Sequence, residues 1–161
     1  MEVEMRIRGL MMDPTTNMPI VVLKDVASDT VLPIWVGVYE ANAIALEIEK
    51  VSTPRPMTHD LLKNVLMGLG AHLRKVVVTD LREDTFYAVI WAERDGQIIS
   101  IDSRPSDALA LALRMDCPIF VDETVLRNSK VASASSDKAT NEELRKWLEG
   151  LNDDDIGRYK M

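Results

Sequence analysis

The first part of the chain alternates between apolar and polar residues. Val3, Met5 and Ile7 share one parity, and charged residues occupy the positions between them. A period of two is typical of a strand with one buried face. Pro33 cannot donate a hydrogen bond to a β-ladder, so the strand that contains it is expected at a sheet edge or at a bulge. The pattern predicts strands over residues 2–12, 20–26 and 31–36.

The period changes at Glu40. Ala41, Ile44, Ala45 and Ile48 follow at the spacing i, i+3, i+4 and i+7, which is the stripe of an amphipathic helix. The prolines in residues 51–57 end this pattern. The sequence therefore predicts a helix that begins near Glu40 and stops before this break.

A second helix is predicted directly after the break. Thr58 is a favourable N-cap residue, and Gly70 suits the end of a helix because it adopts a left-handed conformation without strain. The apolar residues between them recur at helical spacing. We expect these side chains to be buried: Leu61, Leu62, Val65, Leu66 and Leu69.

Three strands in a meander and a third helix follow. Asp95-Gly96 is a strong signal for a two-residue hairpin turn. The third helix begins near Arg104-Pro105, and its stretch 108–113 contains only Ala and Leu, as expected of a helix buried on more than one side. The predicted strands are 76–81, 86–93, 97–101 and 119–121. This order predicts an α+β fold, a single domain with a largely antiparallel or mixed sheet and three core helices.

The composition changes after residue 128. Residues 129–137 are rich in Ser and Ala, which favours a flexible linker. Thr140 and Glu143 fit a capping box at the start of a short C-terminal helix. The predicted organisation is therefore a folded domain over 1–128, a linker over 129–137, and a C-terminal helix and tail over 138–161.

Composition and charge limit the possible functions. The chain has 161 residues, a formal net charge of −7 and one cysteine. No apolar run approaches the ~20 residues that a membrane span needs, and the single cysteine fits a reducing compartment. We therefore expect a cytoplasmic protein without a membrane partner. An acidic chain has no general attraction for nucleic acid, so such a role needs local positive charge or a bridging metal.

Two segments with similar chemistry precede the second and third predicted helices. Each places an arginine, a proline, a hydroxyl residue and an aspartate around a helix start, where free N–H groups and the helix dipole can hold a phosphate. A structural interpretation is also open, in which the hydroxyls cap the helices and the arginines pair with the aspartates. The residues concerned are Arg55, Thr58, His59 and Asp60 in one segment, and Asp102, Arg104, Ser106 and Asp107 in the other.

The same segments resemble the bifunctional nuclease family. The similarity extends over nearly the whole chain, in order and at compatible spacing. It rests on LPIWVG (32–37), EA (40–41), RPMTHD (55–60), FYA (86–88), IDSRPSDA (101–108), PIFV (118–121) and GRYKM (157–161). The resemblance implies an α+β domain that self-associates and an activity that cleaves both DNA and RNA. It assigns no role to single residues.

Residue chemistry supplies a first hypothesis, a nuclease that hydrolyses DNA and RNA with little sequence specificity. Carboxylates are suited to Mg²⁺ or Mn²⁺, histidine to a general base and arginine to a phosphate. We expect His59, Asp60, Asp102 and Asp107 to be catalytic. The expected metal ligands are Glu40, Asp60, Asp102 and Asp107. The expected phosphate-binding residues are Arg55, Arg104, Thr58 and Ser106.

A second hypothesis is a non-catalytic, oligomeric binding or regulatory protein. In this case the same Arg, Asp and His clusters are structural or hold a small anion. The acidic net charge favours it. Under both hypotheses we expect a homo-oligomer, since the Ala/Leu helix and the apolar strands present more apolar surface than one small domain needs.

Overall fold

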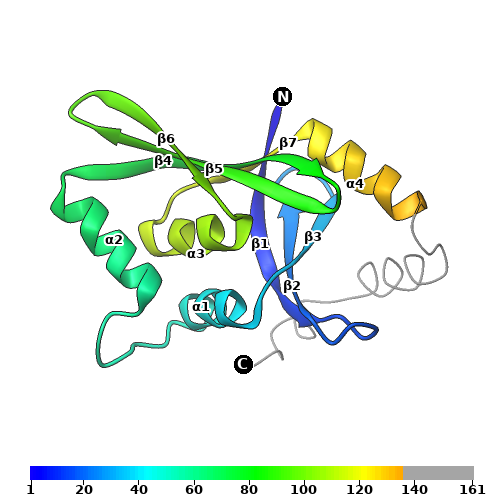
Figure 1. The fold of residues 1–161 in the computed structure, drawn as a ribbon, viewed down its shortest axis with the longest axis horizontal. Coiled ribbons are helices and arrows are strands. Elements are labelled where there is room, and N and C mark those ends of the chain that lie inside the picture. The colour runs from blue at the N-terminus through cyan, green and yellow to red at the C-terminus, as the bar shows by residue number, and fades with distance from the viewer. Residues whose placement is uncertain (136–161) are drawn as a thin grey trace.

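A computed structural model describes residues 1–135, of which side chains are described up to residue 129. This part of the chain forms a seven-stranded mixed sheet and four helices (Figure 1). The strands are β1 (Glu2–Met12), β2 (Pro19–Asp25), β3 (Val31–Trp35), β4 (Ala71–Arg82), β5 (Thr85–Arg94), β6 (Gln97–Ser103) and β7 (Ile119–Asp122). The helices are α1 (Val38–Ile48), α2 (Thr58–Gly68), α3 (Pro105–Met115) and α4 (Glu123–Ser135).

The strands lie in the order β3-β2-β1-β7-β4-β5-β6. Within residues 1–135 every neighbouring pair is antiparallel except β4 and β7, which are parallel. Pro33 lies in β3, an edge strand of the sheet, as its missing N–H predicts. The α+β fold class with a mixed sheet is therefore confirmed.

Helix α3 forms the centre of the hydrophobic core. Its residues Ala108 and Leu109 are 1% and 0% exposed, and they belong to one cluster with Ile44 of α1 and with Ala88 and Ile90 of β5. The alanines of α3 let α1 and the sheet approach it closely. This packing confirms that the Ala/Leu stretch is buried on more than one side, and it fixes the positions of the helix ends.

Two predicted turns have the expected geometry. Gly70 follows the C-cap of α2 with φ of +77°, which is the left-handed conformation that glycine tolerates. Asp95 and Gly96 have φ of +52° and +77° and join β5 to β6, as a two-residue hairpin turn of the primed type requires.

Helix α4 differs from the sequence prediction. It begins where the backbone N–H of Thr124 donates to Asp122 Oδ1 at 2.9 Å, an N-cap interaction, and Val125 is completely buried. The helix continues to Ser135, through the first part of the predicted linker 129–137, because alanine is the strongest helix former. The predicted C-terminal helix and tail, 138–161, lie outside the described residues.

Helix α2 differs in its burial. Leu66 packs against the core, but four other side chains that were expected to be buried are 43–56% exposed. These are Leu61, Leu62, Val65 and Leu69. The helix presents its apolar stripe to solvent because polar residues on its opposite side contact α3. No helix in the described part of the chain is long and apolar enough to cross a membrane.

Candidate functional site

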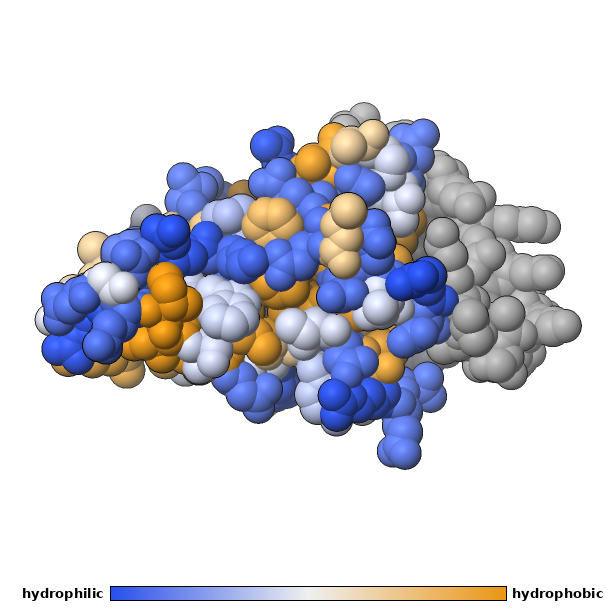
Figure 2. Space-filling view, turned by 90° about the horizontal axis from the view of Figure 1, so that it is seen from above, coloured by the Kyte–Doolittle hydropathy of each residue, from blue (hydrophilic) through white to orange (hydrophobic). Residues whose placement is uncertain are grey.

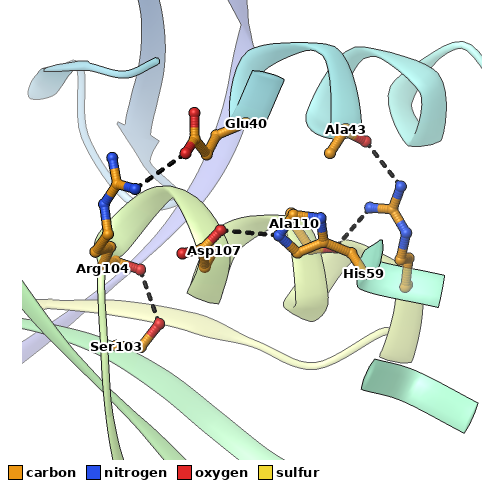
Figure 3. Close-up of polar contacts among 8 residues, drawn as sticks. Glu40, Ala43, His59, Ser103, Arg104, Asp107 and Ala110 are labelled. Atoms are coloured by element: carbon orange, nitrogen blue, oxygen red, sulfur yellow. Dashed lines mark hydrogen bonds and ion pairs between the residues drawn. The ribbon is translucent and has the colours of Figure 1, made fainter. Parts of the chain in front are cut away.

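The first turns of α1 and α2 both carry side chains that contact α3 on the helical side of the sheet (Figure 3). Each of the three helices carries a carboxylate at its third helical position: Glu40 in α1, Asp60 in α2 and Asp107 in α3. A negative charge is favoured there by the helix dipole. Each of the three acids also has a basic partner on another helix, so the site consists of three interhelical acid–base pairs.

The helices begin earlier than the hydroxyl residues predicted. The N-cap of α2 is Met57, so Thr58 is the first helical residue, and the N-cap of α3 is Arg104, so Ser106 is the second helical residue and only 4% exposed. Neither hydroxyl occupies the N-cap position. At α2 the cap comes instead from Asp60, whose Oδ2 accepts a hydrogen bond from the Met57 N–H at 2.9 Å.

The first pair joins α2 to α3. His59 Nε2 lies 2.9 Å from Asp107 Oδ1. The side chain of His59 is 11% exposed, whereas that of Asp107 is 37% exposed. The imidazole therefore fixes the position of a carboxylate that solvent still reaches. The other oxygen, Asp107 Oδ2, is not part of this contact, and among the described residues it has no hydrogen-bond partner.

The second pair joins α3 to α1. The Arg104 guanidinium donates to Glu40 Oε1 at 3.0 Å, and the Arg104 side chain is 66% exposed. A guanidinium has five N–H donors, so this contact leaves donors for a phosphate. Gly37 leaves room for the carboxylate of Glu40, because a Cβ at that position would clash with Glu40 Oε2.

The third pair is the most buried one. The Arg114 side chain is 4% exposed and donates to Asp60 Oδ1 at 2.8 Å, to the Ala110 carbonyl at 2.9 Å and to the Ala43 carbonyl at 3.0 Å. The Met57 N–H and Arg114 hold the pKa of Asp60 below its ordinary value. Arg114, which the sequence interpretation missed, connects all three helices. The feature of the sequence that could have revealed it is a single cation directly after the Ala/Leu stretch 108–113.

Two further predicted site residues lie apart from these pairs. Asp102 of β6 is opposite Val89 in the sheet, whereas its neighbour Ile101 is opposite the buried core residue Ile90. Since successive residues of a strand point to opposite faces, Asp102 is on the face away from α3. Arg55 is exposed, and within residues 1–135 its guanidinium has no hydrogen bond or ion pair in the structure.

The carboxylates do not form a complete metal centre by themselves. Among the described residues, no group of three or more His, Cys, Asp and Glu side chains is placed to hold a metal ion. Glu40 and Asp60 are each paired with an arginine, and Asp107 is paired with His59. Any divalent ion at this site needs further ligands from water or substrate.

Comparison with known proteins gives a consistent family. Residues 21–134 match the model of the bifunctional nuclease domain. An uncharacterized protein of Mycobacterium tuberculosis (strain H37Rv) is 38% identical over 162 residues, which covers 95% of this chain and 97% of that protein. Bifunctional nuclease 1 of Oryza sativa subsp. japonica is 28% identical over 120 residues, and bifunctional nuclease 1 of Arabidopsis thaliana is 28% identical over 109 residues. These matches cover 73% and 65% of this chain, but only 36% and 34% of the plant proteins.

Proposed function

The chain belongs to the bifunctional nuclease domain family, and from this premise we propose that it hydrolyses phosphodiester bonds in both DNA and RNA. The family and the plant relatives support a nuclease. The structural observation that carries the proposal is the exposed Arg104 beside the His59–Asp107 pair. A cation can neutralise charge on the phosphate, and a fixed, solvent-accessible carboxylate can accept a proton from an attacking water; both assist phosphodiester hydrolysis.

Arg104 is the proposed phosphate-binding residue. It is the N-cap of α3, where free backbone N–H groups and the positive end of the helix dipole also favour an anion. The guanidinium can contact two phosphate oxygens at once. Phosphate contacts carry no sequence information, which fits cleavage with little sequence specificity.

Asp107 and His59 are the proposed proton-handling pair. A water that hydrogen-bonds to Asp107 Oδ2 would transfer its proton to that carboxylate as it attacks the phosphorus. The bond between phosphorus and the leaving oxygen would break, and the leaving oxygen would take a proton from solvent water. His59 holds the carboxylate in one orientation from its buried side. This step uses water as the nucleophile and makes no use of a 2′-hydroxyl, so RNA and DNA are equivalent substrates.

Assistance by Mg²⁺ or Mn²⁺ is a further part of the proposal. Mg²⁺ is often bound by one or two carboxylates together with substrate phosphates rather than by a complete protein cage. Glu40 is the protein ligand we propose, with the remaining positions filled by water and substrate, because the two oxygens of Asp107 serve His59 and the attacking water. When bound, the ion would neutralise part of the negative charge of the phosphate, which an acidic protein otherwise repels.

The test compares wild type with Asp107→Asn on labelled single-stranded DNA and RNA, with and without Mn²⁺. The control is Asp95→Asn, the same chemical change at an exposed hairpin turn. We expect metal-stimulated cleavage in wild type and in the control, and its loss in Asp107→Asn. Equal rates in all three identically purified proteins would assign the cleavage to a contaminant.

A non-catalytic binding role is the second candidate. One observation favours it: all three acids of the site are already matched by basic partners in the same chain, as in a structural network. Under this function, no purified variant would differ from wild type in cleavage. Arg104→Ala would instead lose binding of a small anion such as inorganic phosphate.

A further inference from the structure

Asp60 of α2 is a site residue that the proposed hydrolysis does not use. Its two carboxylate oxygens each accept a hydrogen bond, Oδ1 from Arg114 Nε at 2.8 Å and Oδ2 from the Met57 N–H at 2.9 Å. Arg114 is fixed in turn, because its side chain is 4% exposed and also donates to the Ala43 and Ala110 carbonyls. Both oxygens of Asp60 are thus engaged within the protein, on donors that cannot easily move.

Two consecutive residues of α2 contact the same side of α3. His59 Nε2 lies 2.9 Å from Asp107 Oδ1, and the next residue, Asp60, accepts its hydrogen bond from Arg114. Asp107 and Arg114 are seven positions apart in the sequence, which is about two helical turns, so they share a side of α3 and are separated by about 10 Å along its axis. Contacts at two separated points fix both the position and the direction of the start of α2.

Apolar packing contributes little to the placement of α2. Leu66 packs against the core, but the other large apolar side chains of the helix are 43–59% exposed. These are Leu61, Leu62, Val65 and Met67. Figure 1 shows α2 at the left end of the molecule, and Figure 2 shows apolar side chains at the surface of this end. The polar contacts of the first turn therefore determine where α2 lies against α3.

We propose that Asp60 is a positioning residue, which through its contact with Arg114 holds His59 against Asp107. The inference rests on the proposed function, in which His59 and Asp107 handle the proton, and it names the residue that keeps this pair assembled. A hydrogen bond is lost beyond about 3.5 Å, so a shift of about 1 Å in the first turn of α2 separates the pair. Misplacement on this scale is enough to slow an enzyme strongly.

The other roles expected of Asp60 fit its contacts less well. A general base needs an oxygen that reaches the attacking water, and a metal ligand needs an oxygen that is not already committed to N–H donors. The Met57 N–H and Arg114 also hold the pKa of Asp60 below its ordinary value, which makes the carboxylate a weak proton acceptor. Its geometry suits an anchor for the neighbouring histidine.

The chain has only two histidines, which makes a direct test possible. An ionised carboxylate only accepts hydrogen bonds, so Nε2 of His59 should carry a proton that Asp107 protects from exchange with solvent. Heteronuclear NMR spectra of the imidazole rings should show this proton in wild type and its loss in Asp60→Ala. His72 is the internal reference, because its side chain is 63% exposed and its signals should be the same in both proteins.

Asp80→Ala is the matched control. Asp80 also accepts hydrogen bonds from a backbone N–H and from an arginine, those of Leu81 and Arg82, but it lies on β4 and the side chain of Arg82 is 70% exposed. The control should leave the His59 proton protected. If Asp60→Ala does not unfold cooperatively, Asp60→Asn replaces it with the same expected result, because an amide has one oxygen and cannot keep both contacts.

Cleavage of a labelled oligonucleotide supplies the second measurement. In folded Asp60→Ala, kcat should fall roughly tenfold or more, whereas KM should change little because Arg104 still binds phosphate; Asp80→Ala should keep both constants. Wild type without cleavage would refute the proposed function, and the NMR comparison would still decide the role of Asp60. A His59 proton that stays protected in the folded Asp60 variant would overturn the proposal, whatever the rate of cleavage.

Discussion

Asp13 and Asp107 are both aspartates with tight hydrogen bonds, but their surroundings differ in kind. Asp13 is 2% exposed and accepts hydrogen bonds from the Thr15 N–H, from the Thr15 and Thr16 hydroxyls, and from Trp35 Nε1, all within 2.9 Å. Among the described residues, the carboxylate of Asp107 has one hydrogen-bond partner, His59, and the Asp107 side chain is 37% exposed. One carboxylate is saturated and closed off, whereas the other is held at one oxygen and open at the second.

The difference distinguishes a structural carboxylate from a candidate functional one. Burial raises the pKa of Asp13, but the hydrogen bonds from Thr15, Trp35 and Thr16 outweigh it and lower the pKa to about 2. Asp13 therefore stays ionised and fastens the β1–β2 turn to β3, with no free oxygen for a ligand. Asp107 keeps an oxygen that can bind one. Burial and charge alone do not reveal this difference. It is revealed by the number of hydrogen bonds that each carboxylate already accepts.

We expect the largest loss of stability at Arg114, because it lies in the candidate site but, like Asp13, is buried and held by several hydrogen bonds within the protein. Arg114→Met removes three hydrogen bonds and leaves the Ala43 and Ala110 carbonyls without this donor. We expect a loss of about 3 kcal/mol in the free energy of unfolding, measured by urea denaturation. Arg94→Met is the control, because its ion pair with Asp95 is at the surface, where such pairs contribute little. Similar losses in both variants would argue against Arg114 as the link between the three helices.

Asp13 gives the next largest effect, and it depends on pH. Its pKa is about 2 in the folded protein and near 3.8 in the unfolded chain. The lowered pKa therefore adds stability above pH 4, and this contribution disappears as the pH falls from about 4 to about 2. The difference in unfolding free energy between wild type and Asp13→Asn should shrink by about 2 kcal/mol across this range. A constant difference would show that the ionised carboxylate is not the stabilising form.

Arg104 gives the smallest effect on stability. Its ion pair with Glu40 is largely exposed on the arginine side, so Arg104→Ala should change the unfolding free energy by less than about 1 kcal/mol. Binding of a non-cleaved oligonucleotide should weaken roughly tenfold, since a charge-assisted contact to phosphate is lost. Fluorescence anisotropy measures this change. Unchanged oligonucleotide binding together with a lower free energy of unfolding would assign Arg104 a structural role, like that of Asp13.

Local patterns predicted those features that depend on local physics. The hairpin at Asp95-Gly96 and the edge position of Pro33 follow from the backbone preferences of single residues, and both are confirmed. The orientation of α2 could not be predicted in this way. Its apolar stripe predicted burial, but the contacts of His59 and Asp60 with α3 decided which side faces inward.

The candidate site was predictable in part for the same reason. His59, Asp60, Arg104 and Asp107 were found because they cluster near two helix starts. Asp102 is five positions before Asp107, but the chain changes from a strand to a helix between them, and the strand directs Asp102 to the other face of the sheet. The partnership of Asp60 with Arg114 spans 54 positions, and no local spacing reveals it.

The most direct measurement compares two variants, each of which removes the charge of one of these carboxylates. Asp107→Asn and Asp13→Asn are each assayed for cleavage of a labelled oligonucleotide per folded molecule and for the free energy of unfolding at pH 7. We expect Asp107→Asn to lose roughly 100-fold or more in rate with less than about 1 kcal/mol in stability. Asp13→Asn should lose about 2 kcal/mol and keep its rate. The account is contradicted if Asp107→Asn cleaves at the wild-type rate, or if both variants lose activity only in proportion to their loss of stability.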